Sequence, residues 1–227
     1  VNPIKYEKTN DIVDEMIQFG LPPEIIIDNK NGNRSESLIF PWAIINYGKK
    51  SERISLFKKQ LGDNENEKII RSLEGLEHKI LDGIYKVILE KKKNVAVLTS
   101  HKTTENIKIA DLLQSLKPYY NLGSFDLKNE DVTPEKSLEN LKRFQLLIVS
   151  NPKDSFSEKE KYILDQFSLQ GGKLLWMVNG IKMNRDSLFN RYGKAYVLSK
   201  ELNLDDYFFN LGLRIQKTVL KDLYCAP

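Results

Sequence analysis

The sequence is poor in the residues that build metal and redox sites. Its 227 residues include two histidines and one cysteine, Cys225. A single cysteine cannot form an internal disulfide, and no CxxC pair or His/Cys cluster has the spacing of a zinc site. We therefore expect no metal ion and no cofactor, while the cysteine count leaves the redox compartment open.

Long apolar runs are also missing. The longest, residues 38–45, contains Pro41 and has only eight residues, whereas a membrane-spanning helix needs about 20. There is no P-loop motif, no GxGxxG after a predicted strand and no signal-peptide pattern. We expect a soluble piece excised from a longer protein, which does not itself hydrolyse ATP through a P-loop.

Charge of one sign is not concentrated anywhere along the chain. The net charge of +4 results from 35 basic and 31 acidic residues that are well mixed. Proteins that bind nucleic acids usually gather lysine and arginine on one face, so we expect no nucleic-acid partner. The hydrophobic fraction of 41%, with ten Tyr and ten Phe, is sufficient for a folded core.

Residues 1–93 are predicted to form a first, α+β domain. Apolar spacing predicts a helix at residues 5–19, strands at 24–28, 38–47 and 53–57, and a long helix at 64–92. This order resembles the second half of a thioredoxin-like domain, with Pro41 at the place of that family's cis-proline. The resemblance implies a truncated thioredoxin-like domain that lacks the redox cysteines.

Residues 94–227 are predicted to form a second domain, in which strands alternate with helices. Apolar runs predict strands at residues 94–99, 123–127, 145–150 and 173–178. Ser157 and Glu160 have the spacing of a capping box, which predicts a helix from there to Gln170. Short apolar strands joined by helices indicate a parallel sheet covered on both faces, as in flavodoxin-like proteins. We expect a loop at 179–201, a last helix capped by Asn203, and a final strand within 213–223.

Ligands of open parallel sheets bind beyond the carboxyl ends of the strands. Four polar residues occupy those places and form a candidate ligand-binding set: Ser100, His101, Asn151 and Asn179. Ser100 and His101 are the best candidates for a nucleophile and its base. However, neighbouring side chains of an extended strand point in opposite directions, and no G-x-S-x-G elbow surrounds the serine. We therefore expect His101 to be a polar loop residue and the chain to have no catalytic residues.

An aromatic cluster in the last predicted helix is a candidate protein interface. It consists of Tyr207, Phe208 and Phe209. One side of the cluster is expected to pack against the sheet, while large aromatic side chains left exposed would mark a contact surface.

Several segments together resemble a known family. They are Asn2-Pro3, LIFPWAIINYG (38–48), NVAVLTSH (94–101), LLIVSNPKDSFSEKEKYILDQFSLQGGKLLWMV (146–178), NLDDYFFNLGLRI (203–215) and LKDLYCAP (220–227). In order and spacing they resemble the GldG family, the gliding-motility-associated auxiliary component of an ABC transporter. Residues 155–176 are the most specific part of the resemblance.

The resemblance implies a location and partners that the residues alone do not show. Members carry membrane anchors, absent from this chain, and hold their soluble part on the periplasmic side of the cytoplasmic membrane. The resemblance also implies that they work with a permease and an ATPase subunit, and their second half is similar to a scaffold domain of intraflagellar-transport proteins. We therefore expect a non-catalytic auxiliary subunit that acts through protein contacts. A solute- or glycan-binding module is the alternative, and a hydrolase using Ser100 and His101 is a third reading.

Overall fold

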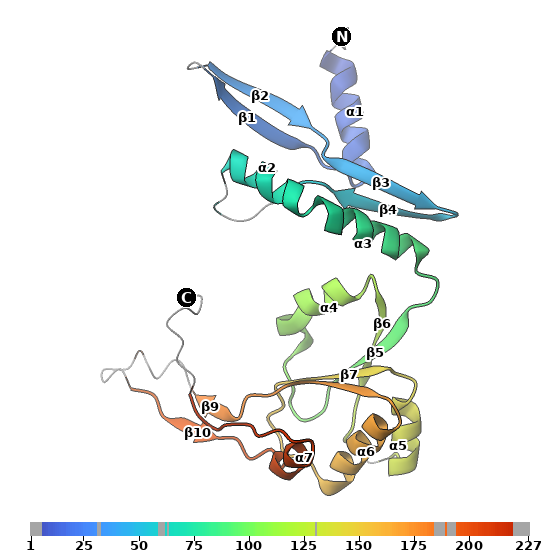
Figure 1. Cartoon of the computed structure of the whole chain (residues 1–227), viewed down its shortest axis with the longest axis vertical. Coiled ribbons are helices and arrows are strands. Elements are labelled where there is room, and N and C mark those ends of the chain that lie inside the picture. The colour runs from blue at the N-terminus through green and yellow to red at the C-terminus, as the bar shows by residue number, and fades with distance from the viewer. Residues whose placement is uncertain are drawn as a thin grey trace. The chain divides into compact units, whose positions relative to one another are not determined.

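The computed structural model describes residues 6–30, 33–58, 62, 64–129, 131–183, 189 and 194–219. It divides into two compact units, Val1–Lys91 and Lys92–Pro227 (Figure 1). Within the described stretches no helix is both long and apolar enough to cross a membrane. The resemblance segments at Asn2-Pro3 and 220–227 lie outside the described residues.

The first unit contains three helices and two separate antiparallel hairpins among its described residues. In chain order these are α1 (Tyr6–Gln18), β1 (Glu24–Lys30), β2 (Asn33–Ile39), β3 (Trp42–Tyr47), β4 (Lys50–Ser55), α2 (Glu65–Glu74) and α3 (Leu76–Ile88). β1 pairs with β2, and β3 pairs with β4. Helix α3 packs on the β3–β4 hairpin, where Ile54 and Val87 are buried.

Pro41 divides the run that we predicted as one strand at residues 38–47. Proline has no N–H to continue a ladder, and the chain bends here: Trp42 N–H donates to the Phe40 carbonyl at 2.8 Å. The segment before the bend pairs with β1 and the segment after it pairs with β4. The resemblance to thioredoxin-like domains implied a cis-proline here, but every peptide bond of the described residues is trans, and Pro41 instead lies directly before the start of β3.

The predicted long helix at residues 64–92 is also divided. Gly75 separates α2 from α3, in keeping with the low helix propensity of glycine. Asn64 begins α2 with a capping box, in which its side chain accepts from Glu67 N–H while the Glu67 carboxylate accepts from Asn64 N–H.

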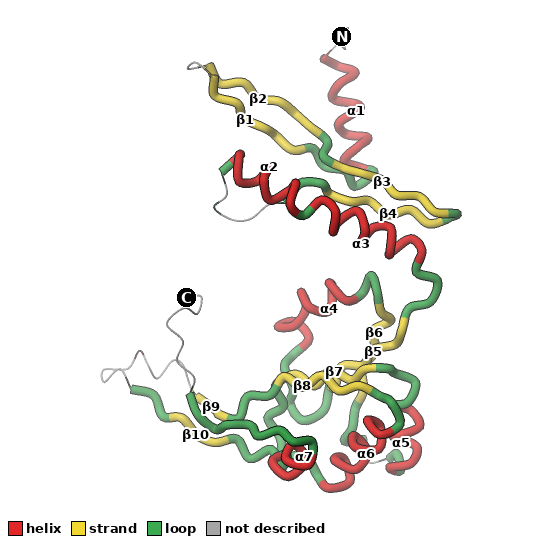
Figure 2. Tube along the Cα trace, in the orientation of Figure 1, coloured by secondary structure: helices red, strands yellow, loops and turns green. Residues whose placement is uncertain are grey.

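The second unit is built on a four-stranded parallel sheet flanked by helices. Its elements are β5 (Lys93–Leu98), a 3₁₀ turn (Asn106–Ile109), α4 (Ala110–Leu116), β6 (Tyr120–Phe125), α5 (Pro134–Leu141), β7 (Leu146–Ser150), α6 (Glu158–Leu169), β8 (Lys173–Met177), β9 (Ile181–Met183), β10 (Val197–Ser199) and α7 (Asp205–Asn210). The strand order is β6-β5-β7-β8, and all three pairings are parallel. Helices α5 and α6 lie on one face of the sheet and α4 lies on the other, as Figure 2 shows.

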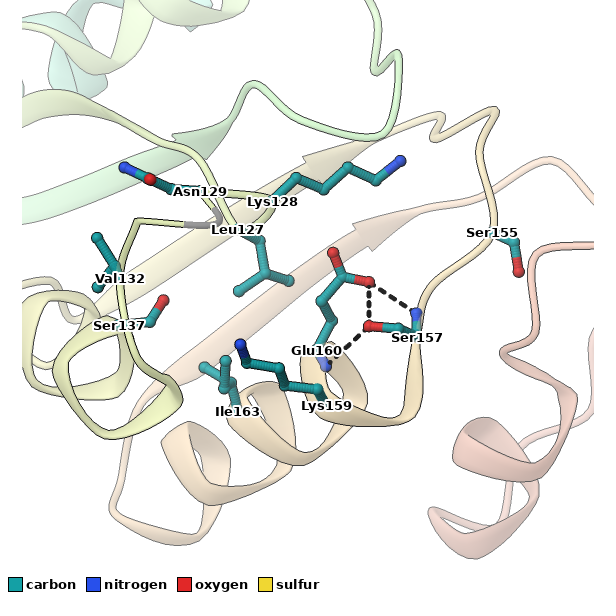
Figure 3. A pocket seen from close by; sticks show the side chains of 10 residues that line it. All are labelled: Leu127, Lys128, Asn129, Val132, Ser137, Ser155, Ser157, Lys159, Glu160 and Ile163. Atoms are coloured by element: carbon teal, nitrogen blue, oxygen red, sulfur yellow. Dashed lines mark hydrogen bonds between the residues drawn. The ribbon is translucent and has the colours of Figure 1, made fainter.

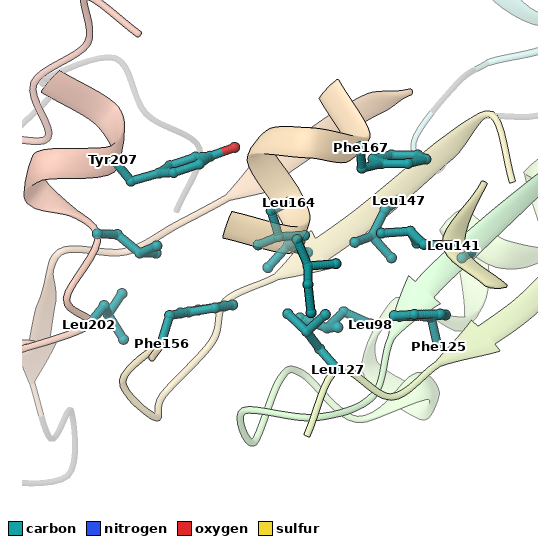
Figure 4. Close-up of a cluster of buried hydrophobic side chains, with 14 of the residues drawn as sticks. Leu98, Phe125, Leu127, Leu141, Leu147, Phe156, Leu164, Phe167, Leu202 and Tyr207 are labelled. Atoms are coloured by element: carbon teal, nitrogen blue, oxygen red, sulfur yellow. The ribbon is translucent and has the colours of Figure 1, made fainter. Parts of the chain in front are cut away.

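The main core lies between the sheet and α5–α6 (Figure 4). Alternate strand residues point into it, including Leu98, Phe125 and Leu147. Leu164 and Phe167 of α6 cover them, and Phe156 and Tyr207 extend the same cluster toward α7. Val95 and Val97 of β5 and Ile148 of β7, which alternate with the core residues of these strands, are buried as well. Burial on both faces explains why short continuous apolar runs predicted these strands correctly.

The end of the chain differs from the prediction in three places. Residues 179–201, expected as a loop, include the antiparallel pair β9–β10. Leu204, not Asn203, precedes α7, and the Asn203 side chain instead donates to the Phe156 carbonyl at 2.8 Å. Residues 213–219 form no strand, and 220–223 lie outside the described residues.

Candidate functional site

Ser100 and His101 lie just beyond β5, and their side chains meet. His101 Nδ1 is 3.0 Å from Ser100 Oγ. The serine is 9% exposed and the histidine 1%. Our expectation that the two side chains do not pair is therefore wrong. His101 does lie in a turn, as expected of a loop residue, but its side chain is buried there. His101 and Lys102 have left-handed backbones, with φ of 62° and 46°, so the alternation of an extended strand does not apply to them.

The Ser100 hydroxyl connects two strand ends. Its oxygen accepts a hydrogen bond from Leu127 N–H, just after β6, at 3.2 Å. The hydroxyl hydrogen is then available to donate to His101 Nδ1, which assigns the other ring proton to Nε2. Ser100 thus joins the ends of β5 and β6 through one buried side chain.

Glu160, in the first turn of α6, faces the other side of the imidazole. His101 Nε2 lies 3.3 Å from Glu160 Oε1, although the two are not aligned as a directed hydrogen bond. Glu160 Oε2 accepts from Ser157 N–H at 2.6 Å and from the Ser157 hydroxyl at 2.7 Å. The capping box predicted for Ser157 and Glu160 is confirmed, and the same carboxylate also provides a negative neighbour for His101.

Burial decides the charge of the imidazole. Removal from water lowers the pKa of His101 below its ordinary value of 6.5, and the attraction of Glu160, which raises the pKa, is the smaller effect. The imidazole is therefore neutral at pH 7. It stacks on Phe156 with ring centroids 3.8 Å apart and planes 12° apart.

Ser100, His101 and Glu160 are the residue types of a hydrolase triad, but a substrate has little access to this serine. A nucleophilic serine must reach the carbonyl carbon of a substrate. Here Ser100 is almost wholly covered and its oxygen already accepts from Leu127 N–H. The contacts tie together the end of β5, the loop after β6 and the start of α6.

The other two members of the predicted ligand set lie apart from this network. Asn151, with a left-handed backbone at φ 44°, follows β7, and its Oδ1 accepts from Lys200 Nζ at 2.8 Å. Asn179 is exposed, and its Oδ1 accepts from Ile181 N–H at 3.2 Å. Among the described residues, no hydrogen bond joins either asparagine side chain to Ser100 or His101, so the four side chains do not form one hydrogen-bonded network.

A pocket of about 440 Å³ opens beside Glu160 (Figure 3). Its walls come from the loop after β6, from α5 and from the start of α6: Leu127, Lys128, Asn129, Val132, Ser137, Ser155, Ser157, Lys159, Glu160 and Ile163. Hydroxyl, amide and ammonium groups thus line it together with a few apolar side chains. From the sequence, Glu160 was predicted only as part of a helix cap. The capping box uses one carboxylate oxygen, and it does not predict that the other oxygen lies beside His101 and the pocket.

The aromatic cluster of α7 is mostly core. Tyr207 is 6% exposed and Phe208 is 4% exposed, and both rings pack against Trp176. These two residues therefore cannot form the predicted interface. Phe209, on the other side of the short helix, is 74% exposed and remains available for contact.

The described part of the chain contains no group of three His, Cys, Asp or Glu side chains that could hold a metal ion.

Comparison with known proteins places the second unit in a family. No curated protein matches the chain. The solved structure of the mmIFT52 N-terminal domain is similar at 18% identity and a TM-score of 0.31, over 40% of this chain and 46% of that one, so the match spans less than half of either protein. Residues 92–227 match the sequence profile of the family described as an ABC-type uncharacterized transport system. The chain therefore belongs to this family and is an auxiliary component of an ABC-type transport system.

Proposed function

We propose that this auxiliary component acts through contacts with other proteins and has no catalytic role. One observation carries the proposal. The sheet reverses its strand order between β5 and β7, and ligands of such sheets bind in the crevice at that point. Here His101 and Phe156 stack beyond those strand ends, and the His101 carbonyl accepts from Lys153 N–H at 2.8 Å. The protein's own side chains and backbone thus occupy the usual ligand position.

We also propose that the chain belongs to the GldG family, with a flavodoxin-like second unit and a thioredoxin-like first unit. With β5 as the first strand, the sheet has the order 2-1-3-4, which is that of flavodoxin-like proteins. In the first unit, the β3–β4 hairpin followed by helices is the part that supports a thioredoxin-like origin. The segments at 146–178 and 203–215 support membership of the GldG family, and with it a role in gliding motility on the periplasmic side of the cytoplasmic membrane.

We place the partner contact at the apolar surface formed by the end of α7 and the residues that follow it. Phe209, Leu211 and Leu213 are 74%, 51% and 57% exposed and lie within five residues of one another. Large apolar side chains of this kind anchor protein interfaces when a partner removes them from water. The proposed partners are the permease and ATPase subunits of the transport system, with the permease in direct contact.

A pull-down of the full-length membrane protein tests the proposal. Phe209→Ser should reduce the amount of permease and ATPase that copurifies, because the anchor loses its apolar area. Tyr162→Ser is the matched control, since Tyr162 is an exposed aromatic residue, at 59%, on α6 of the same unit. Copurification that is unchanged by Phe209→Ser, or lowered equally by the control, would contradict the proposed contact.

The pocket beside Glu160 favours a second candidate, a solute- or glycan-binding module. Serine hydroxyls and the Asn129 amide at its wall are suited to the hydroxyl groups of a sugar. A thermal-shift screen of neutral sugars against the wild type and Asn129→Ala separates the two readings. Stabilisation by a sugar that the variant loses would favour the binding module, and the absence of any shift would favour protein contacts.

A further inference from the structure

A second polar feature of the carboxyl edge of the sheet is a cluster of lysines around Asn151. Lys200 follows β10, and its backbone N–H donates to the Gly180 carbonyl at 2.9 Å. Its side chain reaches Asn151, where Nζ donates to Oδ1 at 2.8 Å. Lys153 lies two residues after Asn151, and Lys182 lies on β9, the strand that pairs with β10.

No carboxylate neutralises these three ammonium groups within the described stretches. Burial, together with the smaller repulsion from Lys153 and Lys182, lowers the pKa of Lys200, and no acidic group opposes the shift. Asp154, next to Lys153, is already engaged, because its two oxygens lie 3.1 Å from Lys102 Nζ and 3.2 Å from Lys128 Nζ. The cluster therefore holds like charges close together with no internal compensation.

We propose that Asn151, Lys153, Lys182 and Lys200 bind a phosphate-type anion, either free or as a lipid headgroup. Two observations of the structure and one general property of lysine point to this chemistry. The residues come from three segments that meet beyond β7 and β8, the edge where parallel sheets bind ligands. Lysine is a common point-charge partner of phosphate. The left-handed backbone of Asn151, with φ 44°, holds the side chain that orients Lys200, and backbones of this kind concentrate at binding sites.

The site differs from the pocket beside Glu160 and from the surface around Phe209. It does not depend on the proposed protein contacts, because none of its residues belongs to either feature. Its charge predicts binding that weakens as salt is added, since lysine ammonium groups at the surface are screened at higher ionic strength. The bound anion should also raise the pKa of Lys200 toward its ordinary value, because it supplies the missing opposite charge.

Lysine side-chain NMR with inorganic phosphate tests the free anion, and co-sedimentation with vesicles of phosphatidylglycerol in phosphatidylcholine tests the headgroup. Both use the 227-residue chain. Lys200→Gln should weaken binding by about tenfold or more, because it removes a charged hydrogen-bond donor. The double variant K153Q/K182Q should do the same and alters only exposed side chains. Lys142→Gln is the control, since Lys142 is an exposed lysine after α5, before the amino end of β7.

Binding of phosphate that is weakened by the cluster variants but not by Lys142→Gln supports a free-anion site. Sedimentation with the anionic vesicles without binding of inorganic phosphate supports a lipid-headgroup site, provided that the cluster variants weaken it and Lys142→Gln does not. Failure to bind either probe would overturn the proposal, as would equal weakening by the control. Neither result changes the expected loss of permease copurification in Phe209→Ser, so the two proposals fail separately.

Discussion

The imidazole of His101 lies flat against the phenyl ring of Phe156, at a centroid distance of 3.8 Å. The two residues come from segments that follow β5 and β7, so the stack joins neighbouring strand ends across the place where the strand order reverses. Both side chains are almost fully buried, at 1% exposure each. The contact thus closes the edge of the sheet at the point where related architectures bind ligands.

Phe156→Ala should lower the free energy of unfolding by about 3–5 kcal/mol, because it removes a fully buried ring and leaves a cavity. Urea denaturation followed by circular dichroism measures the change. Phe209→Ala is the control, since its ring is 74% exposed; we expect a change within about 0.5 kcal/mol. A cost for Phe156→Ala no larger than that of the control would mean that the stack contributes little to stability.

The buried histidine should make stability depend on pH. Burial lowers the pKa of His101 in the folded protein below 6.5, so between the two pKa values the unfolded chain binds more protons. The contribution is fully present above about pH 6.5, the ordinary histidine pKa. It is lost progressively as the pH falls below that value. Urea midpoints at pH 7.5, 6.5 and 5.5 measure the effect.

His101→Gln should flatten this pH dependence, whereas His78→Gln should leave it unchanged because His78 is exposed on α3. The charged groups that face the imidazole are Glu160 on α6 and, at longer range, Lys128 and Asp154 from the neighbouring loops. If the urea midpoint of His101→Gln still falls with pH as in the wild type, the pH dependence of stability comes from groups other than His101.

Ser100→Ala distinguishes a structural hydroxyl from a catalytic one. The change leaves Leu127 N–H without its acceptor, so we expect a cost of about 1–3 kcal/mol in the free energy of unfolding. Copurification of the permease and ATPase with the full-length protein should be unchanged. The wild type should also show no serine-dependent hydrolysis of p-nitrophenyl esters. Ester hydrolysis that disappears in Ser100→Ala would establish the hydrolase reading and end the non-catalytic one.

Gly83→Ala should destabilise the first unit, although alanine normally favours a helix over glycine by about 1 kcal/mol. A methyl group at Gly83 would collide with Cδ1 of Ile54 on β4 and approach Cδ1 of Ile45 at 3.1 Å. Overpacking of this kind costs about 1–3 kcal/mol. Ile54→Val removes Cδ1, the atom nearest to the added methyl, and leaves Cγ1 at 2.8 Å. The double variant should therefore lose less stability than the sum of the losses in the two single variants. Additive losses in the pair would show that the clash is not the cause.

The sequence was informative where local chemistry decides the structure. Apolar runs identified β5, β6, β7 and β8, and the Ser157–Glu160 pair identified the start of α6. It failed where one residue interrupts a longer pattern. Pro41 divides a predicted strand and Gly75 divides a predicted helix, since the apolar spacing continues across both breaks.

The candidate site was harder to predict because it depends on backbone conformation. His101 and Lys102 both have left-handed backbones, and this turn brings the His101 side chain to Ser100. Neither residue is glycine, so the residue types do not predict the turn. The second contact of Glu160 depends on how α6 packs against the end of β5, which is a tertiary property. The burial of Tyr207 and Phe208 beside Trp176 likewise follows from packing, so spacing alone could not separate them from Phe209.

The position of β5 has a consequence for how the second unit is made. This strand hydrogen-bonds with β6 on one side and with β7 on the other. During synthesis, a nascent chain that ends before residue 146 holds β5 with a single neighbour and one open edge. The sheet closes around β5 only after β7 has emerged, so a ribosome-bound chain of that length has an unpaired strand edge that a chaperone can recognise.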